Sequence, residues 1–126
     1  VKKQYDGYTA IEDLKVKGDL TLGENVADQG GLKLAHAAMI EWYAKKGGTE
    51  AERFDRSQQF FLGFAQSWCT KVRPEQAKLR AQTDPHSPPY WRVNGPLGNS
   101  DAFKAAFQCQ DGAKMVRAGA ERCNVW

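Results

Sequence analysis

Apolar residues recur every three or four positions from Leu22 onward, and this pattern predicts a long helix. A period near 3.6 is typical of an amphipathic helix, and the run Lys-Lys-Gly-Gly at 45–48 is a typical helix end. Gly30 and Gly31 lie inside this helix, where each costs about 1 kcal/mol relative to alanine. The two glycines therefore predict either a break in the helix or close packing of another backbone against it.

A second helix is predicted around a dense apolar face at 60–68, which carries three phenylalanines and a tryptophan. Asp55 followed by Gln58 resembles a capping box for its start. Pro74 ends or kinks this run and suits the first turn of a third helix over 75–82.

The remaining segments predict loops and short elements. Residues 1–20 are mixed, with a short extended stretch expected at 15–19. Residues 83–99 hold three prolines between positions 85 and 89, which predicts a stiff loop. Ser100 is expected to cap a short amphipathic helix, and the tail from 109 is polar until its final Val-Trp. The fold class is therefore mainly α, with long ordered loops.

Composition and charge exclude several classes of protein. The 126 residues are 41% hydrophobic and 26% charged, which is typical of one globular domain or a large piece of one. Eighteen Lys and Arg against 15 Asp and Glu give a net charge of +3, scattered without a basic stripe, so nucleic-acid binding is disfavoured. No apolar stretch approaches the roughly 20 residues of a membrane span, and no secretory signal is visible. The start at Val1, without an initiator Met, reads as the interior of a longer polypeptide.

Three cysteines, Cys69, Cys109 and Cys123, leave two alternatives open. In an exported protein an odd number leaves at least one thiol without a partner in this chain, whereas in the cytosol all three would be reduced. Their spacing contains no CxxC pair, which excludes a thiolate metal site.

Glu24 and Asp28 are the first candidates for chemistry, because residues four apart lie on one face of a helix. Like charges so placed repel each other unless a cation or a hydrogen-bond donor lies between or beside them. The alternative is structural: Thr21 with Glu24 fits a capping box, and acidic residues favour a first helical turn. The spacing alone favours this structural explanation.

The proline-rich loop holds two more candidates. His86 is restrained by neighbouring prolines and could be a positioned donor, and Arg92 is a planar fork suited to carbonyl or carboxylate recognition. Taken alone, both are more often ordinary surface-loop residues. His36 lies among alanines and leucines and is interpreted as a structural helix histidine.

Four blocks nevertheless resemble the neprilysin family of zinc metallopeptidases. TLGENVADQGGL at 21–32 is similar to that family's TLGENIADNGGL, and FFLGFAQSWC at 60–69 to its FFLNFAQVWC. Arg73-Pro74 and TDPHSP at 83–88, followed by Arg92, match its TDxHSPxxxR stretch. The ending CNVW at 123–126 is similar to its CxVW. The blocks keep the family's order over nearly the whole chain.

The resemblance implies a role for five residues. Glu24 would be the third ligand of a Zn²⁺ ion whose other two ligands are the histidines of an HExxH helix, and Asp28 would accept a hydrogen bond from one of those histidines. His86 would donate to the oxyanion of the tetrahedral intermediate, with Asp84 orienting it. Arg92 would hold a backbone carbonyl of the substrate. The fold implied is the C-terminal helical portion of a thermolysin-like (gluzincin) catalytic domain.

HExxH is missing from residues 1–126 and is expected upstream of Val1. The whole range 1–126 is then the C-terminal portion of a catalytic domain, inactive by itself because one carboxylate cannot hold a catalytic zinc ion. The intact protein is expected to be a zinc metalloendopeptidase, with peptide substrates and the rest of its own catalytic domain as partners. The alternative is a non-catalytic helical binding module with the same fold.

The resemblance also implies that Cys69, Cys109 and Cys123 form disulfides with cysteines that lie earlier in the chain. Disulfides need an oxidising compartment. The parent protein is therefore expected to be exported: extracellular, periplasmic or a membrane-anchored ectodomain.

Overall fold

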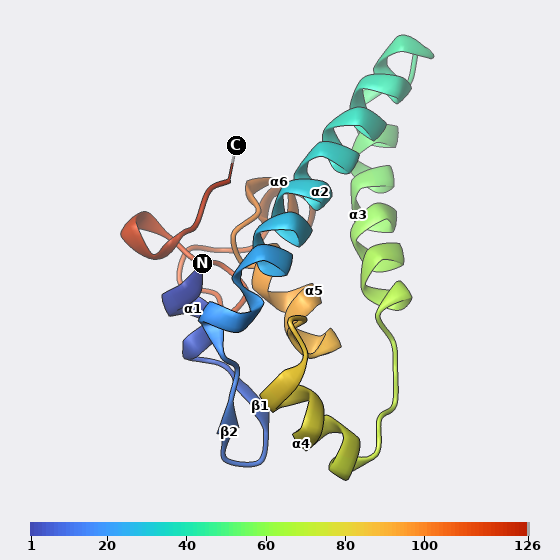
Figure 1. Cartoon of the computed structure of the whole chain (residues 1–126). Helices are drawn as coiled ribbons and strands as arrows, with labels where there is room; N and C mark the ends of the chain where they lie inside the picture. The colour runs from blue at the N-terminus through green and yellow to red at the C-terminus, as the bar shows by residue number, and fades with distance from the viewer. Residues whose placement is uncertain (126) are drawn as a thin grey trace.

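The computed structural model describes residues 1–125, and these are mainly helical (Figure 1). Trp126, the last residue of the CNVW block, lies outside the described residues. The elements, in chain order, are α1 (Lys2–Asp6), β1 (Thr9–Ile11), β2 (Leu14–Lys15), α2 (Gly18–Lys45), α3 (Glu50–Ser67), α4 (Pro74–Thr83), α5 (Pro89–Leu97), α6 (Asp101–Ala106) and the 3₁₀ turn η1 (Gly119–Glu121). Helices α2 and α3 run side by side, and their far ends project beyond the rest of the molecule.

The extended stretch predicted at 15–19 is wrong in its position. The extended residues form the antiparallel hairpin of β1 and β2, in which Thr9 pairs with Lys15. Gly18 already begins α2, and its N–H donates to Asp6 Oδ1 at 2.7 Å. A Cβ at this position would lie 2.5 Å from the carbonyl oxygen of Lys2, so the close contact between α1 and α2 requires glycine here.

Helix α2 is longer than predicted and has no break at its paired glycines. A Cβ added to Gly31 would have no heavy atom within 4 Å, so no backbone packs closely against that residue. The predicted capping box of Thr21 and Glu24 is also wrong, because the helix begins three residues earlier. Thr21 Oγ1 instead donates to the Lys17 carbonyl at 3.1 Å and accepts from Asn25 Nδ2 at 2.8 Å.

Helix α3 also begins earlier than the sequence pattern indicated. Thr49 is its N-cap and accepts from Glu52 N–H at 3.2 Å, while the Glu52 carboxylate accepts from Thr49 N–H at 2.8 Å. This reciprocal pair is the capping box, so the predicted box of Asp55 and Gln58 is wrong. The physical reason is that residues 50–59 are mostly polar, so only a weak apolar period marks this part of the helix.

The 83–99 loop prediction is wrong for its second half, which forms α5. Pro89 occupies the first turn, where a missing N–H costs nothing, and Pro96 lies in the last turn. The sequence has a poor helix propensity, and tertiary packing stabilises the helix: Gly95, Pro96 and Leu97 are buried. A Cβ on Gly95 would lie 2.2 Å from Tyr5 Oη. The other two short helices are confirmed, since Pro74 begins α4 and Ser100 Oγ caps α6 by accepting from Phe103 N–H at 3.1 Å.

The interior has two parts of different chemistry. The first, here called the aromatic cluster, joins α2, α3, α5 and α6 around four buried residues: Leu32, Phe61, Leu97 and Ala106. The second, here called the polar junction, joins α1, α2, α5 and their loops through five buried polar residues: Gln4, Asn25, Gln29, Ser87 and Asn99.

Hydrogen bonds satisfy the polar junction. Asn99 Nδ2 donates to Gln4 Oε1 at 2.9 Å and to Gln29 Oε1 at 3.1 Å, and Gln4 Nε2 donates to the Gly95 carbonyl at 3.0 Å. Within residues 1–125, no buried side-chain nitrogen or oxygen lacks a partner. A search of the same residues for a helix long and apolar enough to cross a bilayer finds none.

Candidate functional site

The four residues singled out by the sequence lie together on one face of α2. Glu24 and Asp28 come from that helix, His86 from the loop after α4, and Arg92 from α5, which packs against α2. His86 Nε2 lies 3.3 Å from Glu24 Oε2, and Arg92 Nη2 lies 2.6 Å from Asp28 Oδ1. Residues up to 68 positions apart in the sequence are thereby brought into one cluster, counting from Glu24 to Arg92 (92 − 24).

Arg92 and Asp28 form a bidentate ion pair, with Nε–Oδ2 and Nη2–Oδ1 distances of 2.6 Å each. Their side chains are only 14% and 11% exposed. The hydrogen bonds that Arg92 donates to Asp28 raise the pKa of Arg92 above its ordinary value, against the opposing effect of burial. The guanidinium also lies over the ring of Trp68, 4.1 Å from its centroid. Two contacts therefore fix the plane of the guanidinium and leave Nη1 without a hydrogen bond to the described residues.

Glu24 is more accessible than Asp28, with 43% of its side chain exposed. Its Oε2 lies between His86 Nε2 and Arg92 Nη2, at 3.3 Å and 3.8 Å. The carboxylate does not fold back onto the helix N-terminus, which begins six residues earlier at Gly18. The Arg92 guanidinium, which pairs with Asp28 and approaches Glu24, explains why two carboxylates four residues apart are tolerated on one helix face.

The loop that carries His86 is held at two points. Asp84 Oδ1 accepts from the His86 backbone N–H at 2.9 Å and lies 2.7 Å from His86 Nδ1. These two contacts with His86 lower the pKa of Asp84, and the backbone N–H has a larger effect than the ring. One residue on, Ser87 Oγ donates to Asn25 Oδ1 at 2.7 Å, and both residues are buried. This second bond anchors the loop directly on α2, beside Glu24.

Sequence reasoning missed Asn25, Ser87 and Trp68 as parts of this site. Asn25 and Ser87 each follow a predicted site residue directly, Glu24 and His86, and that adjacency was the available signal. Nothing local to Trp68 indicates that it would lie under a guanidinium 24 positions later (92 − 68).

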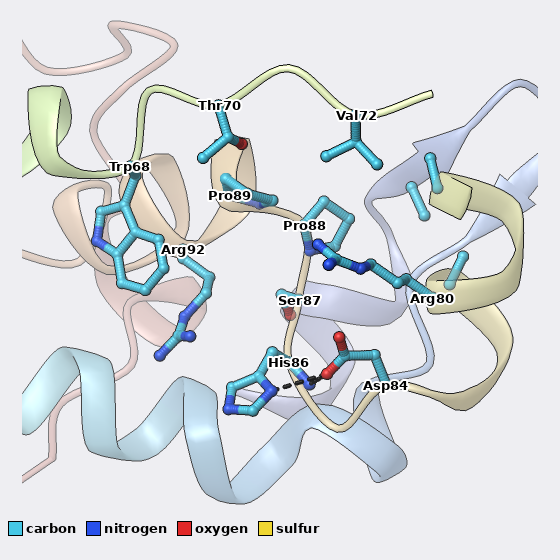
Figure 2. Close-up of a pocket in the computed structure, with 13 residues that line it drawn as sticks. Trp68, Thr70, Val72, Arg80, Asp84, His86, Ser87, Pro88, Pro89 and Arg92 are labelled. Carbon is cyan, nitrogen blue, oxygen red and sulfur yellow. Dashed lines mark hydrogen bonds and ion pairs between the residues drawn. The ribbon is translucent and has the colours of Figure 1, made fainter. Parts of the chain in front are cut away.

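A cavity of about 390 Å³ opens beside this cluster, between α4, α5 and the segment that follows α3. Figure 2 shows Trp68 and Arg92 on one side of it, His86 and Asp84 at its edge, and Arg80 reaching in from α4 toward Pro88. Much of the remaining lining is apolar: Ala10, Val72, Ala77, Ala81, Pro88 and Pro89. A polar cluster beside a largely apolar hollow is the usual form of a binding site.

His36 and the cysteines lie outside this cluster. His36 Nε2 is 2.9 Å from Ser57 Oγ, its ring stacks on Phe61 at 5.0 Å, and burial lowers its pKa. It is a packed helix histidine, as predicted. Cys69, Cys109 and Cys123 form no disulfide with one another.

Comparison with known proteins identifies the family. Residues 1–123 match the model of peptidase family M13. The chain is 43% identical over 129 residues to an endothelin-converting enzyme homolog of Locusta migratoria, covering all of this chain and 17% of that protein. It is 44% identical over 119 residues to neprilysin-1 of Caenorhabditis elegans (90% and 16%) and 42% identical over 127 residues to human endothelin-converting enzyme 1 (98% and 16%).

The chain therefore belongs to peptidase family M13, which confirms the resemblance drawn from its four sequence blocks. It spans 16–17% of the length of these relatives. Its mainly helical structure agrees with a helical region of such a peptidase.

Proposed function

We propose that this chain is the part of a zinc metalloendopeptidase that supplies one metal ligand and the groups that bind the peptide at the reacting carbonyl. The observation that carries the proposal is the position of the Glu24 carboxylate. It is accessible, and it lies between His86 and Arg92, two residues that line the cavity of about 390 Å³. Family membership supports the same reading.

The described residues supply only part of a zinc site. Glu24 has an accessible carboxylate oxygen, a donor that zinc accepts, but residues 1–125 contain no group of three His, Cys, Asp or Glu side chains that could hold a metal ion. The other ligands would come from another part of the polypeptide, from the HExxH helix that the family resemblance implies. Zinc held in such a site supplies an acidified water molecule and polarises a carbonyl.

His86 would act as a hydrogen-bond donor to the negative charge that develops on the carbonyl oxygen. Asp84 at 2.7 Å from Nδ1 favours a proton on that nitrogen and helps to hold the ring orientation. Nε2 then faces the Glu24 side of the cluster, where it donates when the ring is protonated. A donor fixed before the reaction stabilises the transition state without reorganisation.

Arg92 would bind a backbone carbonyl of the substrate. Asp28 and Trp68 hold its guanidinium, so little conformational entropy is lost when Nη1 donates to the peptide. In this arrangement Asp28 is a positioning residue for Arg92. Its oxygens keep lone pairs that could also accept from a ligand histidine outside this chain.

The experiment compares Glu24→Ala with Glu41→Ala in the intact protein. Glu41 is a matched control, because it is an exposed acidic residue of the same helix, paired with Lys45 at 2.6 Å and far along the chain from the cluster. We expect Glu24→Ala to lose both zinc, measured by atomic absorption, and peptide hydrolysis, while Glu41→Ala keeps both. A full zinc complement in Glu24→Ala would remove Glu24 as a ligand.

The same experiment separates the alternative, a non-catalytic helical module. That alternative predicts that the intact wild-type protein binds peptides without cleaving them, whatever its metal content. Export and disulfides between Cys69, Cys109 and Cys123 and cysteines elsewhere in the polypeptide belong to the proposal, and mass spectrometry of the non-reduced intact protein would identify the pairs.

A further inference from the structure

Arg80 is the cavity-lining residue that the proposed chemistry does not use. It extends from α4 into the cavity toward Pro88, from the side opposite the Trp68–Arg92 pair (Figure 2). No hydrogen bond or ion pair of its guanidinium with the described residues is found within 4.0 Å. Its charge acts on Asp84 only at longer range, as the weakest influence on the pKa of that carboxyl.

Within residues 1–125, no charge around the cavity forms an ion pair with Arg80. Asp28 neutralises Arg92 through two hydrogen bonds of 2.6 Å. Asp84, the acidic residue of the lining, is already engaged by the backbone and ring of His86 at 2.9 Å and 2.7 Å. The walls next to Arg80 are apolar, formed in part by Ala77, Ala81 and Pro88. Arg80 is exposed, but the apolar walls on its cavity side reduce the screening of its charge there, so it attracts an anion more strongly than a cation with water on all sides.

We propose that Arg80 determines specificity by binding a carboxylate of the peptide that enters this cavity, either an acidic side chain or the free C-terminus. The inference rests on the proposed function, because it assumes that a peptide lies along Glu24, His86 and Arg92. A guanidinium is suited to this task because its planar N–H groups match the two oxygens of a carboxylate. The volume of about 390 Å³ accommodates a side chain the size of glutamate.

The effect expected is moderate, because Arg80 keeps contact with solvent. Hydrogen bonds to charged groups and partly exposed ion pairs correspond to about a three- to tenfold preference. The intact wild-type protein should therefore favour a peptide with glutamate at the position that enters the cavity over the same peptide with glutamine, by about that factor.

The test uses pairs of peptides in which glutamate or glutamine is moved one position at a time on either side of the cleaved bond. A further pair carries a free or an amidated C-terminus, which distinguishes the two sources of the carboxylate. Wild type is compared with Arg80→Gln, Arg80→Lys, and the control Lys71→Gln, which removes an exposed cation next to the cavity-lining residues Thr70 and Val72. Both kcat/KM and the Kd of each peptide are measured on the intact protein.

We expect Arg80→Gln to abolish the preference for one member of a pair, Arg80→Lys to keep part of it, and Lys71→Gln to leave it unchanged. Equal preferences in wild type and Arg80→Gln, or equal loss in Lys71→Gln, would overturn the proposal. If no peptide is cleaved, the proposed function fails, but the Kd ratio of each pair still tests Arg80. If peptides are cleaved without a charge preference, the inference about Arg80 fails alone.

Discussion

The aromatic cluster and the polar junction lie along the same helix, α2, yet they stabilise the fold in different ways. The cluster buries Phe61 and Leu32 by packing that has no preferred direction. The junction buries Asn25, Gln29 and Asn99, whose hydrogen bonds each demand a particular partner and angle. Apolar burial supplies most of the free energy of folding, whereas the directional bonds fix where each loop lies.

The difference matters for the site because the junction, and not the cluster, carries the His86 loop. Ser87 is tied to Asn25 at 2.7 Å, and Asn25 is the neighbour of Glu24. Buried polar groups therefore hold the proposed metal ligand, Glu24, and the proposed oxyanion donor, His86, in position relative to each other. A substitution in either region should reveal which property it controls, stability or position.

The largest effect is expected from Phe61→Ala, at the centre of the aromatic cluster. Removing a buried phenyl ring leaves a cavity and should lower the free energy of unfolding by about 3–5 kcal/mol. Thermal and urea unfolding of the intact protein would measure it. In the fraction that remains folded, kcat should stay near the wild-type value. A large loss of kcat in fully folded protein would contradict the separation of the two regions.

His86→Ala is expected to have the opposite effect: turnover falls while the stability of the fold is kept. Loss of one oxyanion donor typically lowers turnover by roughly 10²- to 10³-fold. Because His86 is exposed and belongs to neither interior region, stability should change little, and zinc should be retained. Steady-state kinetics with metal analysis checks this, and a wild-type rate would remove His86 from the mechanism.

Asn25→Ala should lower both the stability of the fold and kcat, each by less than the two preceding substitutions. It leaves the buried hydroxyl of Ser87 without its acceptor, at a cost of about 1–3 kcal/mol. It also releases the loop that carries His86. The kcat of the fully folded protein should therefore fall, which the loss of stability alone does not explain. The control is Gln76→Ala, an exposed polar residue of α4. Equal stability of Asn25→Ala and wild type would show that the bond to Ser87 does not hold the loop.

The smallest effect concerns pH. The His86 N–H lowers the pKa of Asp84, so the folded value lies below the unfolded value of about 3.9. The stabilisation is present above that unfolded value and is lost as the pH falls through the folded one. Amide exchange of residues 84–88 should therefore accelerate at acid pH relative to α3. In Asp84→Asn this pH dependence should disappear; its persistence would assign it to another group.

Sequence patterns predicted some elements well because their signals are local. Pro74 and Ser100 mark helix starts through the backbone at their own positions, and both predictions are confirmed. The start of α3 after its N-cap Thr49 was missed because its first turns are mostly polar and carry only a weak apolar period. Helix α5 was missed because its prolines and Gly95 have poor helix propensity, and tertiary packing against α2 and against Tyr5 of α1 makes the helix favourable.

The candidate site divides in the same way. The sequence by itself determined the family, from four blocks along the chain, and the helix face shared by Glu24 and Asp28, which are four residues apart. The family resemblance implied the short link between Asp84 and His86. Only the tertiary structure decided that Asp28 pairs with Arg92, 64 positions away, and that Arg80 lines the cavity without an ion-pair partner among residues 1–125. Local spacing encodes which face a side chain occupies. Its partner across the fold depends on how helices pack, which no local pattern specifies.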